Sequence, residues 1–169
     1  MTLLKAIHLI KNKNIQLLII GDGEKKRFLV DFIKKKKLSS VVKIISYKIN
    51  PYKYIRKANI FILTSKFEGL PNVLLEALVL KKYIISTNCP TGPREILLNG
   101  KVGDLIKIGD YKTLSKKVLD YSKGNSKFKN RLKKKINIGY QNLNRFDYDF
   151  NMKKYYNLLK KYYHNGKII

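Results

Sequence analysis

The chain has 169 residues, 44% of them hydrophobic, which is enough to build one globular core and argues against a disordered chain. Its one cysteine excludes an internal disulfide, and its two histidines stand too far apart in the sequence to form a metal-ligand motif. The net charge of +26 points to an anionic partner, either nucleic acid or an acidic membrane surface, unless the basic surface is only solvated.

The basic residues are almost all lysine, since only five of the 37 are arginine. Base recognition and stacking on nucleic acid favour arginine, so the composition speaks against nucleic-acid binding. Lysines are attracted to acidic lipid headgroups, which favours an anionic membrane surface as partner. No apolar run reaches the ~20 residues that span a bilayer, and residues 1–5 lack the pattern of a signal peptide. We expect a cytoplasmic chain, either soluble or peripheral on the membrane.

Apolar runs alternate with amphipathic stretches along the first 121 residues. Helical spacing of leucine and isoleucine predicts a helix at residues 1–11, and "IQLLII" then indicates a buried strand that ends in Gly21-Asp22-Gly23. The predicted strands are residues 15–20, 41–47, 59–64, 83–87 and 104–108, and the further helices are residues 24–37, 51–57, 71 onward, 94–98 and 111–121. Strands separated by helices predict a parallel sheet with helices on both faces, which is the α/β doubly wound arrangement.

The chain changes character after residue 121. A polar stretch, "SKGNSKFKN", leads into two predicted lysine-rich helices at residues 131–140 and 150–163. We therefore expect a sheet domain at residues 1–121 and lysine-rich C-terminal helices at residues 122–169 that pack on the same domain.

The stretch "SKFEGLPNVLLEAL" at residues 65–78 contains two of the four glutamates of this basic chain. It begins at the carboxyl end of the third predicted strand, where open α/β sheets bind ligands, and Pro71 opens the next helix. The helix start offers unpaired N–H groups to an anion, and Glu76 lies about 7.5 Å along the axis from Pro71. That spacing suits a nucleoside diphosphate, with a phosphate at the helix start and the ribose hydroxyls at Glu76. Glu68 would then face the group beyond the far phosphate.

A second interpretation remains open on spacing alone. Glu68 is equally well a surface loop residue and Glu76 a solvent-facing helix residue, because glutamate is common at both kinds of position. The two carboxylates follow no recognised metal-ligand pattern. The residues by themselves therefore predict no more than an anion-binding junction between a strand and a helix.

Four motifs in order give a more specific signal, namely G-D-G at residues 21–23, S-x-x-E-G-L-P-N-V-L-L-E at residues 65–76, C-P-T-G-P-R-E-I at residues 89–96 and G-D at residues 109–110. With them, nearly the whole chain resembles the carboxy-terminal, nucleotide-sugar-binding domain of the retaining family-four glycosyltransferases, the GT-B group. It is most similar to bacterial enzymes that build lipid-linked oligosaccharides, capsule or lipopolysaccharide. The resemblance implies a Rossmann-like sheet, and we expect Gly92 and Pro93 to shape a turn rather than to touch the donor.

The resemblance also implies roles for individual residues. Glu68, as the catalytic glutamate, contacts hydroxyls of the donor sugar, and Glu76 binds the ribose diol. The implied donor-binding set is completed by the backbone of Gly69, Leu70, Pro71 and Asn72 near the sugar and diphosphate, and by Val42 and Tyr47 near the base. The implied donor is a nucleotide sugar, expected to be UDP-linked, and the acceptor is a glycan or a lipid-linked sugar. Transfer retains the anomeric configuration without an obligatory metal or other cofactor.

The sequence departs from the resemblance at its amino end. In such enzymes an arginine and a lysine that hold the diphosphate lie upstream of the helix that matches "LLKAIHLI", together with the first strand and the acceptor domain. We therefore expect a truncated or split enzyme whose missing amino-terminal acceptor domain is a partner. In the strand order 3-2-1-4-5-6 the first strand would lie between residues 15–20 and residues 59–64, so these two strands should have open edges or pair with each other.

Three functions fit the sequence. A donor-binding component of a glycosyltransferase leads. A non-catalytic remnant, or a partner module that completes a separately encoded half, is the alternative, and a basic nucleic-acid-binding protein comes third. If the chain is active alone, other lysines, such as Lys5 or Lys66, must take over the phosphate.

Overall fold

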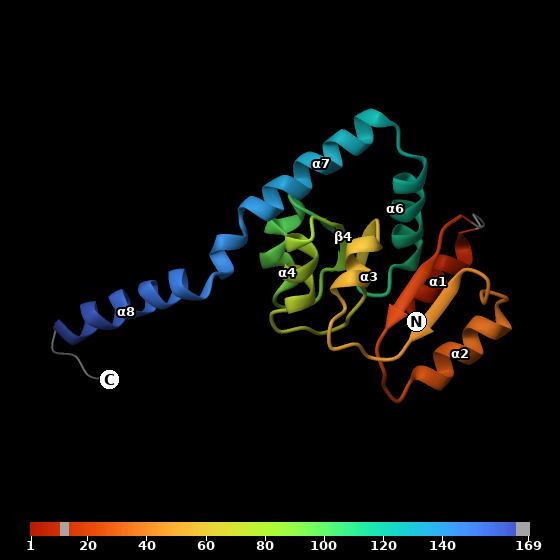
Figure 1. The fold of residues 1–169 in the computed structure, drawn as a ribbon, viewed down its shortest axis with the longest axis horizontal. Coiled ribbons are helices and arrows are strands. Elements are labelled where there is room, and N and C mark those ends of the chain that lie inside the picture. Colours follow the sequence, from red (N-terminus) through yellow and green to blue (C-terminus); the bar gives the residue numbers. More distant parts are fainter. Residues whose placement is uncertain (11–13, 165–169) are drawn as a thin grey trace.

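Five short strands form two separate parallel sheets (Figure 1). The computed structural model describes residues 1–10 and 14–164. The strands are β1 (Leu17–Ile20), β2 (Val42–Ile45), β3 (Ile60–Leu63), β4 (Tyr83–Thr87) and β5 (Asp104–Ile106). β1 pairs with β2, and β4 lies between β3 and β5, so that Ile85 lies opposite both Ile62 and Asp104. The predicted α/β class, with parallel strands and intervening helices, is confirmed.

Helices connect the strands and follow the last one. The helical segments are α1 (Thr2–Leu9), α2 (Lys26–Lys35), α3 (Tyr52–Lys57), α4 (Asn72–Val79), α5 (Pro93–Ile96), η1 (Leu98–Gly100), α6 (Tyr111–Lys123), α7 (Ser126–Gln141), η2 (Leu143–Phe146) and α8 (Tyr148–His164). α7 begins earlier than predicted because Asn125 caps it, accepting a 3.0 Å hydrogen bond from the N–H of Phe128. No helix in the described part of the chain combines the length and the apolar character that a bilayer-spanning segment needs.

The strands β1 and β3 keep open edges. Across residues 1–10 and 14–164, no backbone pairing joins β1 to β3, and each pairs on one side only. The side chains of β3 are all half-buried and Leu18 of β1 is exposed, whereas β4 is buried throughout. Of the two outcomes expected for these strands, open edges rather than mutual pairing is the one found. Apolar strands with an unpaired edge are surfaces that proteins normally cover.

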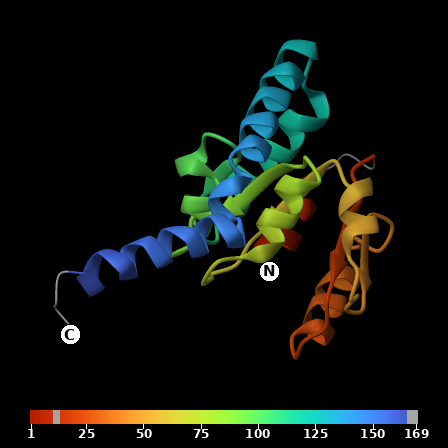
Figure 2. The ribbon, with the colours of Figure 1, turned by 60° about the vertical axis from the view of Figure 1, so that its left-hand side comes forward.

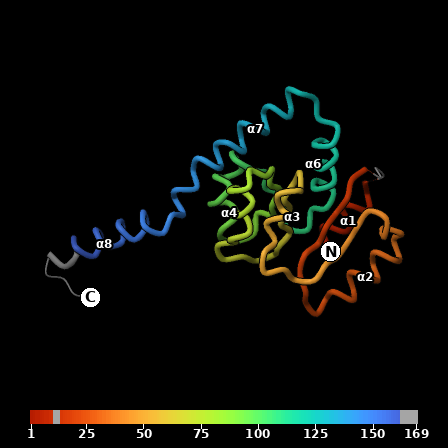
Figure 3. Tube along the Cα trace, viewed as in Figure 1, coloured from red at the N-terminus to blue at the C-terminus, as the bar shows by residue number. Residues whose placement is uncertain are grey.

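Helix packing, rather than strand pairing, joins the two sheets. α1 packs along α6 (Figure 3). One apolar cluster includes Leu4 of α1, Val42 of β2, Ile85 of β4 and Leu114 of α6, so it spans both sheets. A second cluster includes Leu74 of α4 and lies within the half of the molecule that contains β3, β4 and β5. The two sheets therefore share a core although their strands do not meet.

The two C-terminal helices differ in how they meet the body. α7 packs against α4, where Gly139 is buried and a Cβ atom in its place would lie 2.8 Å from the side chain of Leu78. α8 extends away from the rest of the molecule (Figure 1, Figure 2), and its side chains as far as residue 161 are all exposed. Tyrosine, phenylalanine, methionine and leucine side chains are among them.

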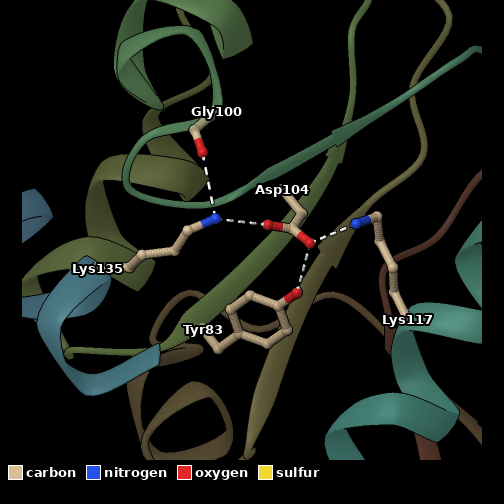
Figure 4. Close-up of polar contacts among 5 residues, drawn as sticks. All are labelled: Tyr83, Gly100, Asp104, Lys117 and Lys135. Carbon is tan, nitrogen blue, oxygen red and sulfur yellow. Dashed lines mark hydrogen bonds and ion pairs between the residues drawn. The ribbon is translucent and has the colours of Figure 1, made fainter. Parts of the chain in front are cut away.

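A polar cluster around Asp104 ties β5 to β4, α6 and α7 (Figure 4). The carboxylate accepts hydrogen bonds from the Tyr83 hydroxyl at 2.9 Å and from the Lys117 ammonium at 2.5 Å. Lys135 donates to the same carboxylate at 2.9 Å and to the carbonyl of Gly100 at 3.3 Å. Burial opposes the charge of Asp104, but these hydrogen bonds outweigh it and hold the pKa of Asp104 below its usual value. Burial, followed by the charge of Asp104, raises the pKa of Tyr83.

Candidate functional site

Two loops lie side by side at the carboxyl end of the three-stranded sheet. Residues 64–71 join β3 to α4, and residues 88–92 join β4 to α5. Because β3 and β4 are parallel neighbours, both loops leave the same edge of the sheet, which is the usual ligand side of an open α/β sheet. We call residues 64–71 the glutamate loop, since it contains Glu68, and residues 88–92 the glycine loop, since it contains Gly92.

Hydroxyl groups join the two loops. Thr87, the last residue of β4, donates a 2.6 Å hydrogen bond to the carbonyl oxygen of Ser65. The hydroxyl of Thr91 donates to the carbonyl oxygen of Glu68 and also lies 2.7 Å from the carbonyl oxygen of Pro90. A hydroxyl has one proton, so these two carbonyl groups share or compete for it. The backbone of the glutamate loop is thus tied to β4 at one point and to the glycine loop at another.

Gly92 lies against the glutamate loop. It is buried and has a φ of +68°, a conformation that glycine adopts without steric cost. A Cβ atom at this position would lie 2.1 Å from the carbonyl oxygen of Gly69 and 2.4 Å from Cδ of Pro71. No residue with a side chain fits here unless the glutamate loop moves.

The predicted residues of the glutamate loop lie next to one another at the start of α4. Glu68 is half-buried, Gly69 and Leu70 are exposed, Pro71 is buried, and Asn72 is exposed as the first residue of α4. No side chain in the described structure caps this helix. Its first N–H groups are therefore free of a capping side chain and are oriented toward any anion that binds there.

Glu76 lies about one turn into α4, roughly 7.5 Å along the axis from Pro71. The residue is half-buried, and its Oε2 atom is buried without a hydrogen-bond partner among the residues that the structure describes. Leaving a buried acceptor without a donor costs on the order of 1–3 kcal/mol. A hydroxyl group of a bound ligand could donate to this oxygen and remove that cost. The Oε2 atom of Glu76 is therefore the feature of this region that points most directly to a ligand.

The structure separates the two residues expected near the base. Val42 begins β2 and is buried in the core, whereas Tyr47 follows the carboxyl end of that strand and is 68% exposed. The N–H of Tyr47 donates to Asp22 at 2.7 Å, and Lys26 donates to the other oxygen of Asp22 at 2.6 Å. The hydrogen bond from Lys26, and next that from Tyr47, lowers the pKa of Asp22. Only Tyr47 lies at the end of β2 where a ligand could reach it, while the side chain of Val42 fills the core at the opposite end.

The charges of three lysines affect the amino end of α1. Burial, followed by the charges of Lys5, Lys25 and Lys66, lowers the pKa of the Met1 amino group. Lys66 belongs to the glutamate loop, and Lys25 precedes α2, just after the Gly-Asp-Gly turn that follows β1. The sequence suggested Lys5 and Lys66 as phosphate partners but not Lys25.

Two contacts made by motif residues were also missed from the sequence. These are the tie of Asp22 to the end of β2 and the tie of Thr91 to the glutamate loop. Asp22 stands in the G-D-G motif and Thr91 in the C-P-T-G-P-R-E-I motif, and this membership was the only indication in the sequence that either residue has a role. Their partners lie 25 and 23 residues away along the chain, so only the folded arrangement shows the contacts.

Comparisons with known proteins agree with this arrangement. Residues 1–137 match the family described as Glycosyl transferases group 1. An uncharacterized glycosyltransferase of Methanocaldococcus jannaschii is 46% identical over 87 residues, which are 52% of this chain and 21% of that protein. The N-acetylgalactosamine-N,N'-diacetylbacillosaminyl-diphospho-undecaprenol 4-alpha-N-acetylgalactosaminyltransferase of Campylobacter jejuni is 31% identical over 123 residues, which are 71% of this chain and 34% of that protein.

A solved structure shows the same fold. The crystal structure of Anabaena HepE in complex with UDP-glucose superposes with a TM-score of 0.81 and 17% identity, covering 94% of this chain and 44% of that one. The chain spans 21% and 34% of the two relatives' lengths. The family match covers most of the chain, and the GT-B fold agrees with it. The chain therefore belongs to the glycosyl transferases group 1 family.

Proposed function

We propose that this chain is the donor-binding, carboxy-terminal part of a retaining glycosyltransferase, which transfers a sugar from a nucleotide-activated donor to a glycan or lipid-linked acceptor. The observation that carries the proposal is the buried, unpartnered Oε2 atom of Glu76, one turn into the helix that follows the glutamate loop. The crystal structure of Anabaena HepE with UDP-glucose supports a UDP-linked donor. The name of the Campylobacter relative, which includes diphospho-undecaprenol, supports a lipid-linked acceptor.

The proposed donor lies along α4. Its diphosphate accepts hydrogen bonds from the uncapped start of the helix, its ribose hydroxyls donate to Glu76, and its sugar faces Glu68. Charge develops on the diphosphate as the bond to the sugar breaks, and positive groups already in place stabilise it without an obligatory metal. We assign this role to Lys66, because it stands in the glutamate loop two residues before Glu68.

We propose that acceptor binding comes from a partner domain outside these residues. The open edges of β1 and β3, together with the half-exposed side chains of β3, support a further strand between the two sheets. The same edges favour the second candidate, a non-catalytic partner module of a split enzyme. The two candidates differ in whether the completed assembly transfers sugar.

The proposed location is the cytoplasmic face of a membrane. The net charge of +26 and the dominance of lysine favour attraction to acidic headgroups. A lipid-linked acceptor would be presented at the same surface, so the charge would bring the enzyme to its acceptor.

Titration with UDP in a calorimeter tests the donor site. If Glu76 holds the ribose diol, Glu76→Ala should weaken UDP binding by about 1.5–3 kcal/mol, the value of a hydrogen bond to a charged group. UDP should also bind more tightly than its 2′-deoxy form. Asp149→Ala, which removes a carboxylate from the exposed helix α8, is the charge-matched control and should bind UDP like the wild type. Equal titrations for wild type and Glu76→Ala, or for UDP and 2′-deoxy-UDP, would contradict the role of Glu76.

A further inference from the structure

The glycine loop has no assigned role in donor binding, yet it touches the glutamate loop at three positions. Thr91 contacts the backbone of Glu68, and Gly92 contacts the backbone of Gly69 and the ring of Pro71. We propose that Thr91 and Gly92 are positioning residues, which hold the glutamate loop in the shape that binds the donor without touching the donor themselves. This inference rests on the proposed function for the identity of the ligand.

Thr91 fixes the residue that carries the catalytic carboxylate. Its hydroxyl donates to the carbonyl oxygen of Glu68, so it restrains the peptide plane that sets the direction of the Glu68 side chain. Thr91 has a φ of +62°, which β-branched residues rarely adopt. Such a conformation persists only where surrounding contacts determine it, and here the contact is to the glutamate loop. The two loops thus hold each other in place.

Gly92 fixes the part of the loop that leads into α4. A side chain at this position would have to push the Gly69 carbonyl away by about 1 Å, because real Cβ atoms essentially never come closer than 3.0 Å to such an atom. Gly69 and Pro71 stand on either side of Leu70, directly before the helix start proposed to bind the diphosphate. A shift of this size changes the direction of the N–H groups that the diphosphate needs.

A pair of glycine variants separates this role from a general effect on folding. Gly92→Ala and Gly100→Ala both place a Cβ at a positive φ, but the site of Gly100, at +87°, has open space around it and lies outside both loops. We expect Gly92→Ala alone to increase hydrogen exchange of the amides in residues 65–72, measured by mass spectrometry without nucleotide. We also expect it to bind UDP more weakly than Gly100→Ala. Equal exchange in this segment and equal UDP affinity for the two variants would overturn the proposal for Gly92.

A pair of threonine variants tests the hydroxyl. Thr91→Ser keeps the donor and Thr91→Val removes it while retaining the branched shape. Thr91→Val should increase exchange in residues 65–72 and weaken UDP binding about fivefold, the effect of one neutral hydrogen bond, whereas Thr91→Ser should match the wild type. Equal behaviour of the two variants would overturn the role of the hydroxyl.

The readouts distinguish this inference from the proposed function. If the wild type does not bind UDP, the proposed function fails, but the exchange comparison still decides whether the glycine loop orders the glutamate loop. If Gly92→Ala does not fold, the Thr91 pair decides the proposal, because Thr91→Ser adds no atom and Thr91→Val only replaces the hydroxyl oxygen, which contacts the Glu68 carbonyl, with a methyl group. Increased exchange with unchanged UDP affinity would overturn the link to donor binding.

Discussion

Replacing Asp104 with asparagine tests whether the cluster in Figure 4 holds α6 and α7 on the sheet. Asparagine keeps the shape but removes the charge that faces Lys117 at 2.5 Å and Lys135 at 2.9 Å. Hydrogen bonds to a charged group contribute about 1.5–3 kcal/mol each, and breaking a buried ion pair costs roughly 3–5 kcal/mol. The Asp104 side chain is 17% exposed but the lysines are 28% and 29% exposed, so water compensates them in part. We expect the free energy of unfolding to fall by about 2–4 kcal/mol.

Urea unfolding followed by circular dichroism measures this loss. Asp149→Asn removes the same charge from the exposed helix α8 and should change the free energy of unfolding by no more than about 0.5 kcal/mol. The double variant Asp104→Asn with Lys117→Met should lose less than the sum of the two single losses, since the two groups interact directly. An Asp104→Asn protein that unfolds at the same urea concentration as the wild type would refute the assignment of the cluster as a tie between helices and sheet.

Four further expectations follow from the charges and the candidate site. The pKa of Asp104 is lower in the folded protein than its usual value of 3.8, so the stabilising effect of its charge is present above that value and is lost as the pH falls through the folded-state pKa. The urea midpoints of wild type and Asp104→Asn should therefore converge in acid, and a difference between the midpoints that stays constant with pH would contradict this. The chain should sediment with phosphatidylglycerol vesicles and be released by salt, and a preference for duplex DNA at the same salt would favour nucleic-acid binding instead. Lys66→Ala should weaken UDP binding more than Lys66→Arg does, and equal affinities would exclude Lys66 as a phosphate partner. The isolated chain should not transfer sugar to a lipid-linked acceptor but should do so when produced together with a matching acceptor domain. Glu68→Ala should abolish the activity of that assembly. Turnover by the chain alone would show that its own lysines suffice to stabilise the diphosphate.

Much of the fold could be predicted because four of the five strands are short, mostly apolar runs next to a glycine or an asparagine. Strand order also predicted that β1 and β3 would either keep open edges or pair with each other, and the structure shows open edges. The start of α7 did not, because residues 126–130 are mostly polar and the helix there depends on the Asn125 cap rather than on apolar spacing. The Asp104 cluster was missed because its partners lie 13, 21 and 31 residues away, and nothing in sequence order brings them together.

The candidate site also has a part that the sequence could predict and a part that it could not. The glutamate loop was predictable because Glu68, Pro71 and Glu76 stand close together in one motif. Val42 and Tyr47 were both expected near the base, but they lie at opposite ends of β2. Val42 is therefore buried in the core, whereas Tyr47 is exposed at the carboxyl end. Contacts such as that of Thr91 with Glu68 depend on how two loops meet, which motif spacing does not specify.

The unpaired edges of β1 and β3 have a consequence for the colloidal behaviour of the chain. Each edge presents N–H and C=O groups with which a second copy can pair, while the net charge of +26 keeps copies apart. That repulsion extends over ~10 Å at 0.1 M salt but only ~3 Å at 1 M. The concentrated salt that strips such a basic protein from an ion-exchange resin or a vesicle thus also removes its protection against edge-to-edge association. Dilute, weakly buffered solutions favour the monomer, and high-salt elution favours self-association through the same strands that a partner segment would cover.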